Sequence, residues 1–204
     1  MRLILSFMMI LGLICPSTLL ASASQIRTSS EPLTTEIRMI TPFTHHGINS
    51  KLRITNETTG SCWASSHANS ARPNTWRCKA DNVVYDPCFK NPVKDHQSVI
   101  CLKSPWDKNA VLVKLESPLP YDVKSTQFNT NKSIPWALEL INGKYCTFTT
   151  TPTGEIAGQP ITYRCDAGSY VIGEIERSTQ NWFVLYHGND SLYMKQVRVK
   201  AAWY

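Results

Sequence analysis

Cysteine content is the feature that most constrains the fold of this chain. Seven cysteines occur among 204 residues, and one of them lies in an N-terminal apolar segment. The other six are Cys62, Cys78, Cys88, Cys101, Cys146 and Cys165. An even number of cysteines in an exported chain indicates disulfide bonds, because the compartments outside the cytoplasm are oxidising.

The pairing of these six cysteines is open from the sequence alone, since about 15 connectivities are possible. We expect the sequential set, because each neighbouring pair brackets a short segment that contains turn residues. That set joins Cys62 to Cys78, Cys88 to Cys101 and Cys146 to Cys165. Loops of this length stabilise a fold by about 3 kcal/mol each in the chain-entropy description.

The N-terminus has the pattern of a secretory signal peptide. One basic residue, Arg2, precedes an apolar run from Leu3 to Cys15, and Ala21-x-Ala23 follows as a cleavage site. A membrane anchor would need about 20 apolar residues, and Pro16 interrupts the run too early. We therefore expect a signal peptide over residues 1–23, no membrane span, and a secreted, periplasmic or extracellular protein after its removal.

Charge and length narrow the class of protein further. The net charge of +6 becomes +5 once Arg2 is removed, and basic residues form no long run. This mild excess does not indicate nucleic acid as a partner. A mature chain of about 180 residues suffices for one domain with a real core. We expect a monomer without cofactor or metal.

Residues 24–59 are rich in Ser and Thr and predict a polar, extended arm. Within it, Lys51–Thr55 alternates apolar and polar residues and predicts one edge strand. His45 and His46 lie in the same arm. Because no cysteine, acid or third histidine lies nearby at ligand spacing, we expect this pair to be exposed to solvent rather than bound to a metal.

Residues 60–204 predict a single disulfide-stabilised β domain. The cysteine segment at its start is expected to be loop-rich, with a turn at Tyr85–Phe89, where Asp precedes Pro. Asn142-Gly143 predicts a hairpin with a type I′ turn. The expected strands are 82–85, 98–101, 110–116, 136–141, 144–149, 161–165, 169–175, 182–187 and 192–199. Short strands at this spacing predict an all-β, mainly antiparallel fold, either a β-sandwich or a small β-barrel. Helix should be scarce, with one short helix around Ser65–Ala71.

Gly60–Ala64 reads Gly-Ser-Cys-Trp-Ala, which resembles the segment around the nucleophile of papain-like cysteine proteases. A protease would use Cys62 as thiolate, with His187 and Asn189 as partners. The family's glutamine six residues before the nucleophile is Asn56 here, however, and an unpaired Cys62 would leave an odd number of cysteines. We therefore expect a structural half-cystine and no catalytic residues.

Other hydrolase signatures are weaker still. The chain has neither a Gly-x-Ser-x-Gly elbow nor a His-Glu-x-x-His zinc helix. Carboxylates able to meet in space as a glycosidase pair are Asp81, Asp86, Asp107, Glu116 and Glu139, but nothing selects a pair among them.

Aromatic residues are numerous, with six Trp and eight Tyr. Such side chains form recognition surfaces when exposed, because they combine a large contact area with a polar tip. Trp63 and Trp76 neighbour cysteines and are expected to pack against disulfides. Trp106, and Tyr186 with His187 at a hairpin end, are the candidate binding residues.

An ordered set of motifs resembles a family of small exported bacterial proteins of unassigned function. The motifs are Gly60–Trp63, Ala71–Cys78, Tyr85–Phe89, Ile100–Cys101, Lys114–Pro120, Pro135–Leu140, Gly143–Cys146 and Ala202–Tyr204. The resemblance implies an envelope or secreted protein and brings no catalytic residues. We expect a module that binds a glycan or protein surface of the envelope or a host. The alternatives are a secreted hydrolase, such as a cysteine protease using Cys62 and His187, and a purely structural role.

Overall fold

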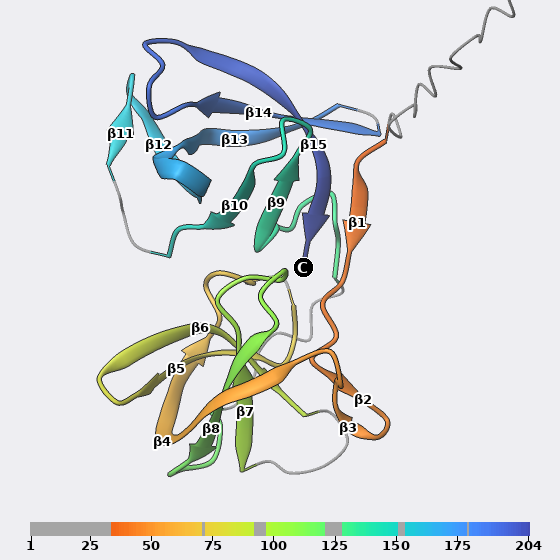
Figure 1. Cartoon of the computed structure of the whole chain (residues 1–204), viewed down its shortest axis with the longest axis vertical. Helices are drawn as coiled ribbons and strands as arrows, with labels where there is room; N and C mark the ends of the chain where they lie inside the picture. Colours follow the sequence, from red (N-terminus) through yellow and green to blue (C-terminus); the bar gives the residue numbers. More distant parts are fainter. Residues whose placement is uncertain (1–33, 71, 92–96, 121–127, 151–153, 179) are drawn as a thin grey trace, which may run out of the picture. The chain divides into compact units, whose positions relative to one another are not determined.

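A computed structural model describes residues 34–70, 72–91, 97–120, 128–150, 154–178 and 180–204. The predicted signal peptide over residues 1–23 lies outside this range. The described residues all belong to one compact unit. Their regular structure is β throughout, apart from a three-residue 3₁₀ turn at Asp166–Gly168, which confirms the all-β prediction (Figure 1).

The strands are β1 (Glu36–Arg38), β2 (Phe43–Thr44), β3 (Gly47–Ile48), β4 (Arg53–Ser65), β5 (Thr75–Ala80), β6 (Val83–Lys90), β7 (Ser98–Cys101), β8 (Asn109–Leu115), β9 (Ala137–Leu140), β10 (Tyr145–Phe148), β11 (Glu155–Ile156), β12 (Gln159–Cys165), β13 (Tyr170–Ser178), β14 (Asn181–His187) and β15 (Met194–Trp203).

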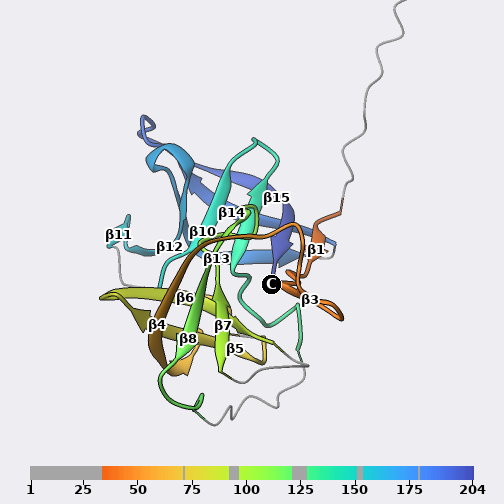
Figure 2. The same cartoon turned by 60° about the horizontal axis from the view of Figure 1, so that its bottom comes forward.

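Strands β4 to β8 form a closed barrel in which each strand pairs with the next in sequence. Because five strands alternate in direction, the first and the last run the same way, and β4 closes the barrel by pairing in parallel with β8. Figure 2 shows these two strands side by side.

Gly60 is the residue at which β4 passes from one neighbour to the other. It pairs with Leu115 of β8 and with Ala80 of β5. A Cβ atom at this position would lie 2.2 Å from the backbone oxygen of Lys79. Only glycine therefore permits the close approach that closes the barrel.

The remaining long strands form a second ring. Its order is β15-β14-β13-β12-β10-β9, and β9 pairs with β15 as well as β10, so the two ends of the sheet meet. β11 is attached to β12, and β1 adds to β15 in parallel. The side chains buried within this ring include Leu138, Tyr163, Val171, Val184 and Tyr204.

Residues from both sheets share a third buried cluster. Phe89 of β6 and Ile100 of β7 meet Trp136, which precedes β9. The ring centroids of Phe89 and Trp136 lie 6.0 Å apart. Ile40 completes the contact from the segment after β1, and its amide donates to the carbonyl of Tyr204 at 2.8 Å.

Residues 34–59, the described part of the predicted arm, carry β1, β2, β3 and the start of β4. The strand expected at Lys51–Thr55 appears as the beginning of β4, where Arg53 and Ile54 pair with β8. His45 and His46 form the turn between β2 and β3 and are exposed, as expected.

Three local predictions turned out differently. Tyr85–Phe89 lies inside β6 and is not a turn, because β5 and β7 pair with it on both sides. The short helix expected around Ser65–Ala71 is not formed in its described part: Ser65 ends β4 and residues 67–70 form a bend and a turn, while residue 71 lies outside the described residues. The hairpin at Asn142-Gly143 is confirmed, but only Gly143 has a positive φ, of 77°. The amide of Gly143 donates to the carbonyl of Leu140 and that of Leu140 to Lys144, which is a type I turn followed by a left-handed glycine.

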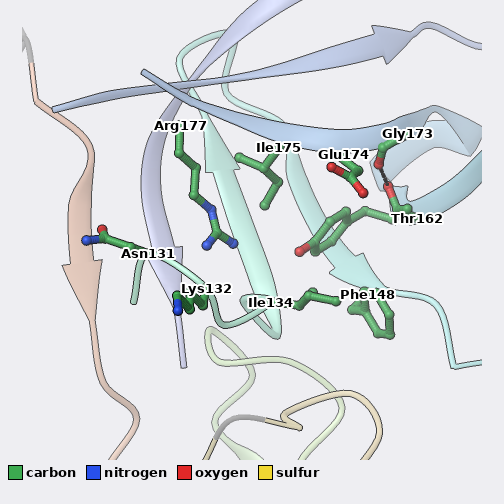
Figure 3. Close-up of a pocket in the computed structure, with 10 residues that line it drawn as sticks. Asn131, Lys132, Ile134, Phe148, Thr162, Gly173, Glu174, Ile175 and Arg177 are labelled. Carbon is green, nitrogen blue, oxygen red and sulfur yellow. Dashed lines mark hydrogen bonds between the residues drawn. The ribbon is translucent and has the colours of Figure 1, made fainter. Parts of the chain in front are cut away.

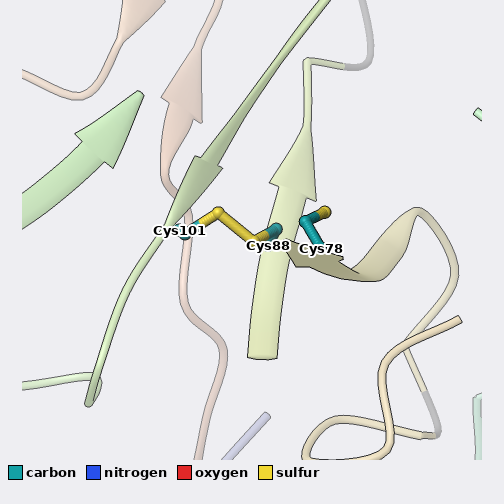
Figure 4. A group of neighbouring side chains, drawn as sticks. All are labelled: Cys78, Cys88 and Cys101. Carbon is teal, nitrogen blue, oxygen red and sulfur yellow. A yellow bond between two sulfur atoms is a disulfide. The ribbon is translucent and has the colours of Figure 1, made fainter. Parts of the chain in front are cut away.

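All three disulfides of the sequential set are present, joining Cys62 to Cys78, Cys88 to Cys101 and Cys146 to Cys165. Each links residues directly opposite on neighbouring strands. Two of them lie next to each other in the β4–β8 barrel, where the sulfurs of Cys78, Cys88 and Cys101 are within 4.8 Å of one another (Figure 4).

Among the helical residues that the structure describes, no stretch has the length and apolar character needed to cross a membrane.

Candidate functional site

A groove of about 370 Å³ brings Trp106 together with residues from distant parts of the sequence. We call it the Trp106 groove. Its lining residues come from the segment after β1, the segment before β4, the β7–β8 loop and the end of β15. They are Met39, Ile40, Thr41, Asn49, Lys51, Leu52, Pro105, Trp106, Asp107, Lys108 and Trp203.

Trp106 is held at the groove by a tight turn in the β7–β8 loop. Pro105 precedes Trp106 in the chain. The backbone amide of Asp107 donates to the carbonyl oxygen and to the hydroxyl oxygen of Ser104. Proline at the second position of a turn presets the backbone angle. The half-buried indole lies with its ring centroid 4.8 Å from that of Tyr145, at 46°. Trp106, which the sequence suggested as a binding residue, thus lines a groove.

Trp203 supplies the second indole. It lies on β15 opposite Arg38 of β1, whose guanidinium carbon is 5.2 Å from the Trp203 ring centroid. Arg38 also bonds to the Glu139 carboxylate at 3.0 Å, and Lys200 bonds to the other oxygen of Glu139 at 2.8 Å. These contacts hold the cation over the indole and thereby fix the ring.

The same contacts give a structural role to Glu139, which is one of the carboxylates considered above as part of a glycosidase pair. Its side chain is 10% exposed and faces two cations. A buried acid needs such partners to remain charged. Glu139 therefore acts as the centre of an ion network that includes Arg38, the cation over the Trp203 ring.

Polar groups at the groove divide into those that shape it and those left for a ligand. Asn49 shapes it, since its amide nitrogen donates to Thr41 and its amide oxygen accepts from the backbone of Lys51. Asp107 uses one oxygen to accept from the Asn109 amide at 2.9 Å. The other oxygen of Asp107 and the ammonium groups of Lys51 and Lys108 make no hydrogen bond within the described residues.

Cys62 does not provide a thiol, because its sulfur is bonded to Cys78 and the residue is buried. His187 lies on β14 of the other sheet, and its buried Nδ1 atom has no hydrogen-bond partner among the residues that the structure describes. Asn189 is exposed and contacts the neighbouring Asp190. The nucleophile arrangement considered from the sequence is therefore not formed.

Tyr186 differs from the expectation of an exposed ring. It is 5% exposed and belongs to the core of the second ring. Along β14 the residues Trp182, Val184 and Tyr186 alternate toward the core, so Tyr186 follows the buried phase of its strand. Its neighbour His187 takes the opposite phase.

The two tryptophans beside cysteines also separate. Trp76 is buried, as expected, but Trp63 is 49% exposed under the guanidinium of Arg77. On β4 the side chain of Cys62 points into the barrel, so that of Trp63 points out.

Asp86 is the carboxylate that is most clearly structural. It accepts from the hydroxyl of Ser66 and from the amides of His67 and Ala68, and Arg77 lies 3.9 Å away. Burial raises the pKa of Asp86, although these hydrogen bonds and Arg77 act in the opposite direction. Asp86 thus fastens the segment after β4 to β6.

In the part of the chain that the structure describes, Cys78, Cys88 and Cys101 are the only group of three potential metal ligands. All three sulfurs are in disulfides, which removes the thiolates that a metal would need.

No protein-family model, curated protein or solved structure matches this chain. The candidate site consequently stands on its own geometry.

Proposed function

We propose that the protein is exported and binds glycans through the Trp106 groove. The observation that carries the proposal is the convergence of Trp106 and Trp203 on one groove, although nearly half the sequence separates them. Tryptophan faces of this kind cover the apolar C–H face of a sugar ring, while a few polar groups bind its hydroxyls. Asp107, Lys51 and Lys108 supply such groups.

The location outside the cytoplasm rests on two supports. Three disulfides fit an oxidising compartment, and residues 1–23 have the pattern of a signal peptide. A secreted or periplasmic protein would meet polysaccharides of the envelope or of a host surface.

A protein partner is the second candidate, and the tip of the β14–β15 loop favours it. Leu192 and Tyr193 are 91% and 80% exposed. Exposed apolar side chains of this size are typical of contact surfaces. This tip is separate from the Trp106 groove, so the two candidates depend on different residues.

The test is a glycan binding screen on the oxidised protein without its first 23 residues, followed by titration calorimetry of each hit. We expect Trp106→Ala to lower the affinity at least about tenfold. Stacking of a nucleobase on an aromatic face contributes on the order of 1–3 kcal/mol, and we take a sugar face on Trp106 to contribute a similar amount. Trp63→Ala is the matched control, because it removes a more exposed tryptophan that lies outside the groove. Full binding by the Trp106→Ala protein, or an equal loss in both variants, would contradict the proposal.

A further inference from the structure

A second cavity, of about 360 Å³, lies on the ring of strands that contains β13. We call it the Arg177 pocket. It is lined by Asn131, Lys132, Ile134, Phe148, Thr162, Tyr163, Gly173, Glu174, Ile175 and Arg177. None of these residues lines the Trp106 groove. Figure 3 shows them around the cavity.

The floor of the Arg177 pocket is apolar and already formed. Ile134, Phe148 and Ile175 line it (Figure 3), and Tyr163 is a further lining residue. The Phe148 and Tyr163 ring centroids lie 5.6 Å apart at 76°. The hydroxyl of Tyr163 donates to the carbonyl of Pro135 at 2.9 Å, and the ring is buried. A floor held in this way does not have to reorganise when a ligand enters.

One side of the pocket is positively charged and rigid. Arg177 donates to the carbonyls of Thr130 at 3.0 Å and Ser133 at 2.6 Å, and its guanidinium carbon lies 4.6 Å from the Trp182 ring centroid. The hydroxyl of Tyr204 lies 3.1 Å and 3.2 Å from the same two carbonyl oxygens and shares its single hydrogen between them. A guanidinium has five N–H donors, so these carbonyls leave most of them for a carboxylate.

Lys132 adds a second positive charge beside Arg177, and Glu174 lies on the opposite side of the pocket (Figure 3). Both side chains are exposed at the rim, and neither makes a hydrogen bond or an ion pair within the described residues. An apolar floor therefore separates two cations from one carboxylate.

We propose that the Arg177 pocket binds a small zwitterion with an apolar body, such as an amino acid or dipeptide that has an aliphatic or aromatic side chain. The carboxylate of the ligand pairs with Arg177 and Lys132, its ammonium group with Glu174, and its side chain packs on Ile134, Phe148 and Ile175. The volume is at the lower end of the range for small-molecule sites, which excludes a large ligand from entering whole.

The test uses titration calorimetry of the oxidised protein with three probes: leucyl-phenylalanine, its N-acetyl form and its C-terminal amide. Each blocked form lacks one of the two charges and keeps the apolar body. We expect the free dipeptide to bind at least about tenfold more tightly than either blocked form, because each charge-assisted contact is worth on the order of 1.4 kcal/mol or more.

Two variants assign each end of the ligand to its partner. Glu174→Gln should remove the preference for the free dipeptide over the N-acetyl form and keep the preference over the amide. Lys132→Gln should reduce the preference over the amide and leave the preference over the N-acetyl form unchanged. Glu155→Gln, at an exposed acid on β11 outside the pocket, is the matched control and should change neither.

Failure of the free dipeptide to bind, or equal affinity for all three probes, overturns the proposal. So does an equal response of Glu174→Gln and Glu155→Gln. Trp106→Ala should leave the affinity for the dipeptide intact, so this result is independent of glycan binding at the groove.

Discussion

Replacing Cys62 with serine removes half of one disulfide and leaves Cys78 as a thiol inside the β4–β8 barrel. The sulfurs of Cys88 and Cys101 lie within 4.8 Å of it. Disulfides rearrange when a thiolate attacks a disulfide sulfur. We therefore expect Cys62→Ser to yield a mixture. Most molecules keep the Cys88–Cys101 bond, and in a minority Cys78 has exchanged into it and released Cys88 or Cys101 as the free thiol.

The native and the rearranged disulfides differ little in the loop-closure entropy by which they stabilise the fold. The native Cys88–Cys101 bond has a sequence separation of 13, for which the chain-entropy description gives about 2.9 kcal/mol. The rearranged bonds close loops of about 10 and about 23 residues, for about 2.7 and about 3.4 kcal/mol. These values lie within about 1 kcal/mol of one another, so the strand register decides. Since Cys88 lies directly opposite Cys101, we expect native pairing to dominate and rearranged forms to be a detectable minority of the molecules.

The assay is alkylation of the Cys62→Ser protein after incubation at about pH 8.5, where an ordinary thiol is half ionised, followed by peptide mapping. Label on Cys88 and Cys101 as well as on Cys78 is expected. Cys146→Ser is the matched control, because its remaining thiol, Cys165, belongs to the other sheet. Label on Cys78 alone would refute the reasoning from proximity, and equal rearrangement in the control would show that unfolding is responsible.

Two further predictions concern stability. Gly60→Ala should cost at least about 3 kcal/mol in urea unfolding, because its Cβ would meet the backbone of β5. A Cβ at Gly143 would meet no described residue within 4 Å apart from the chain neighbours, so Gly143→Ala should cost only about 1 kcal/mol through its positive φ. Equal losses in the two variants would contradict this. Burial raises the pKa of Asp86 above its ordinary 3.8, so the folded state holds this proton more tightly than the unfolded state. Its stabilising contribution is fully present below about pH 3.8 and is lost as the pH rises through the raised pKa; Asp86→Asn should flatten that decline, and an unchanged pH profile of the unfolding free energy would count against it.

The sequence predicted those features of the fold that depend on residues close together in the chain, such as turns, short disulfide loops and single strands. The hairpin around Asn142-Gly143 and the sequential disulfides follow from turn chemistry and short spacing. The strands after residue 109 follow from apolar runs, except for the two-residue β11, which was not predicted. The β-turn expected at Tyr85–Phe89 failed because strand pairing on both sides overrode the preference of Asp-Pro for a turn.

Contacts between distant segments escaped prediction. The parallel pairing of β4 with β8 and the closure of β9 onto β15 leave no pattern in either segment alone. Trp203 was not recognised for the same reason, since only the fold brings it to Trp106. Burial of Tyr186 and exposure of Trp63 depend on which face of each strand turns inward, and cysteine neighbours do not reveal that phase.

The end of β15 supports both proposed sites, because Trp203 contributes to one of them and the next residue, Tyr204, contributes to the other. Trp203 lines the Trp106 groove, whereas Tyr204 lies in the core and bonds the carbonyls that hold Arg177. A slip of one residue would exchange the two faces of the strand and remove both side chains from their places at once. The pairing of Trp203 with Ala137 on one side and with Arg38 on the other therefore fixes the strand register on which both proposed sites depend.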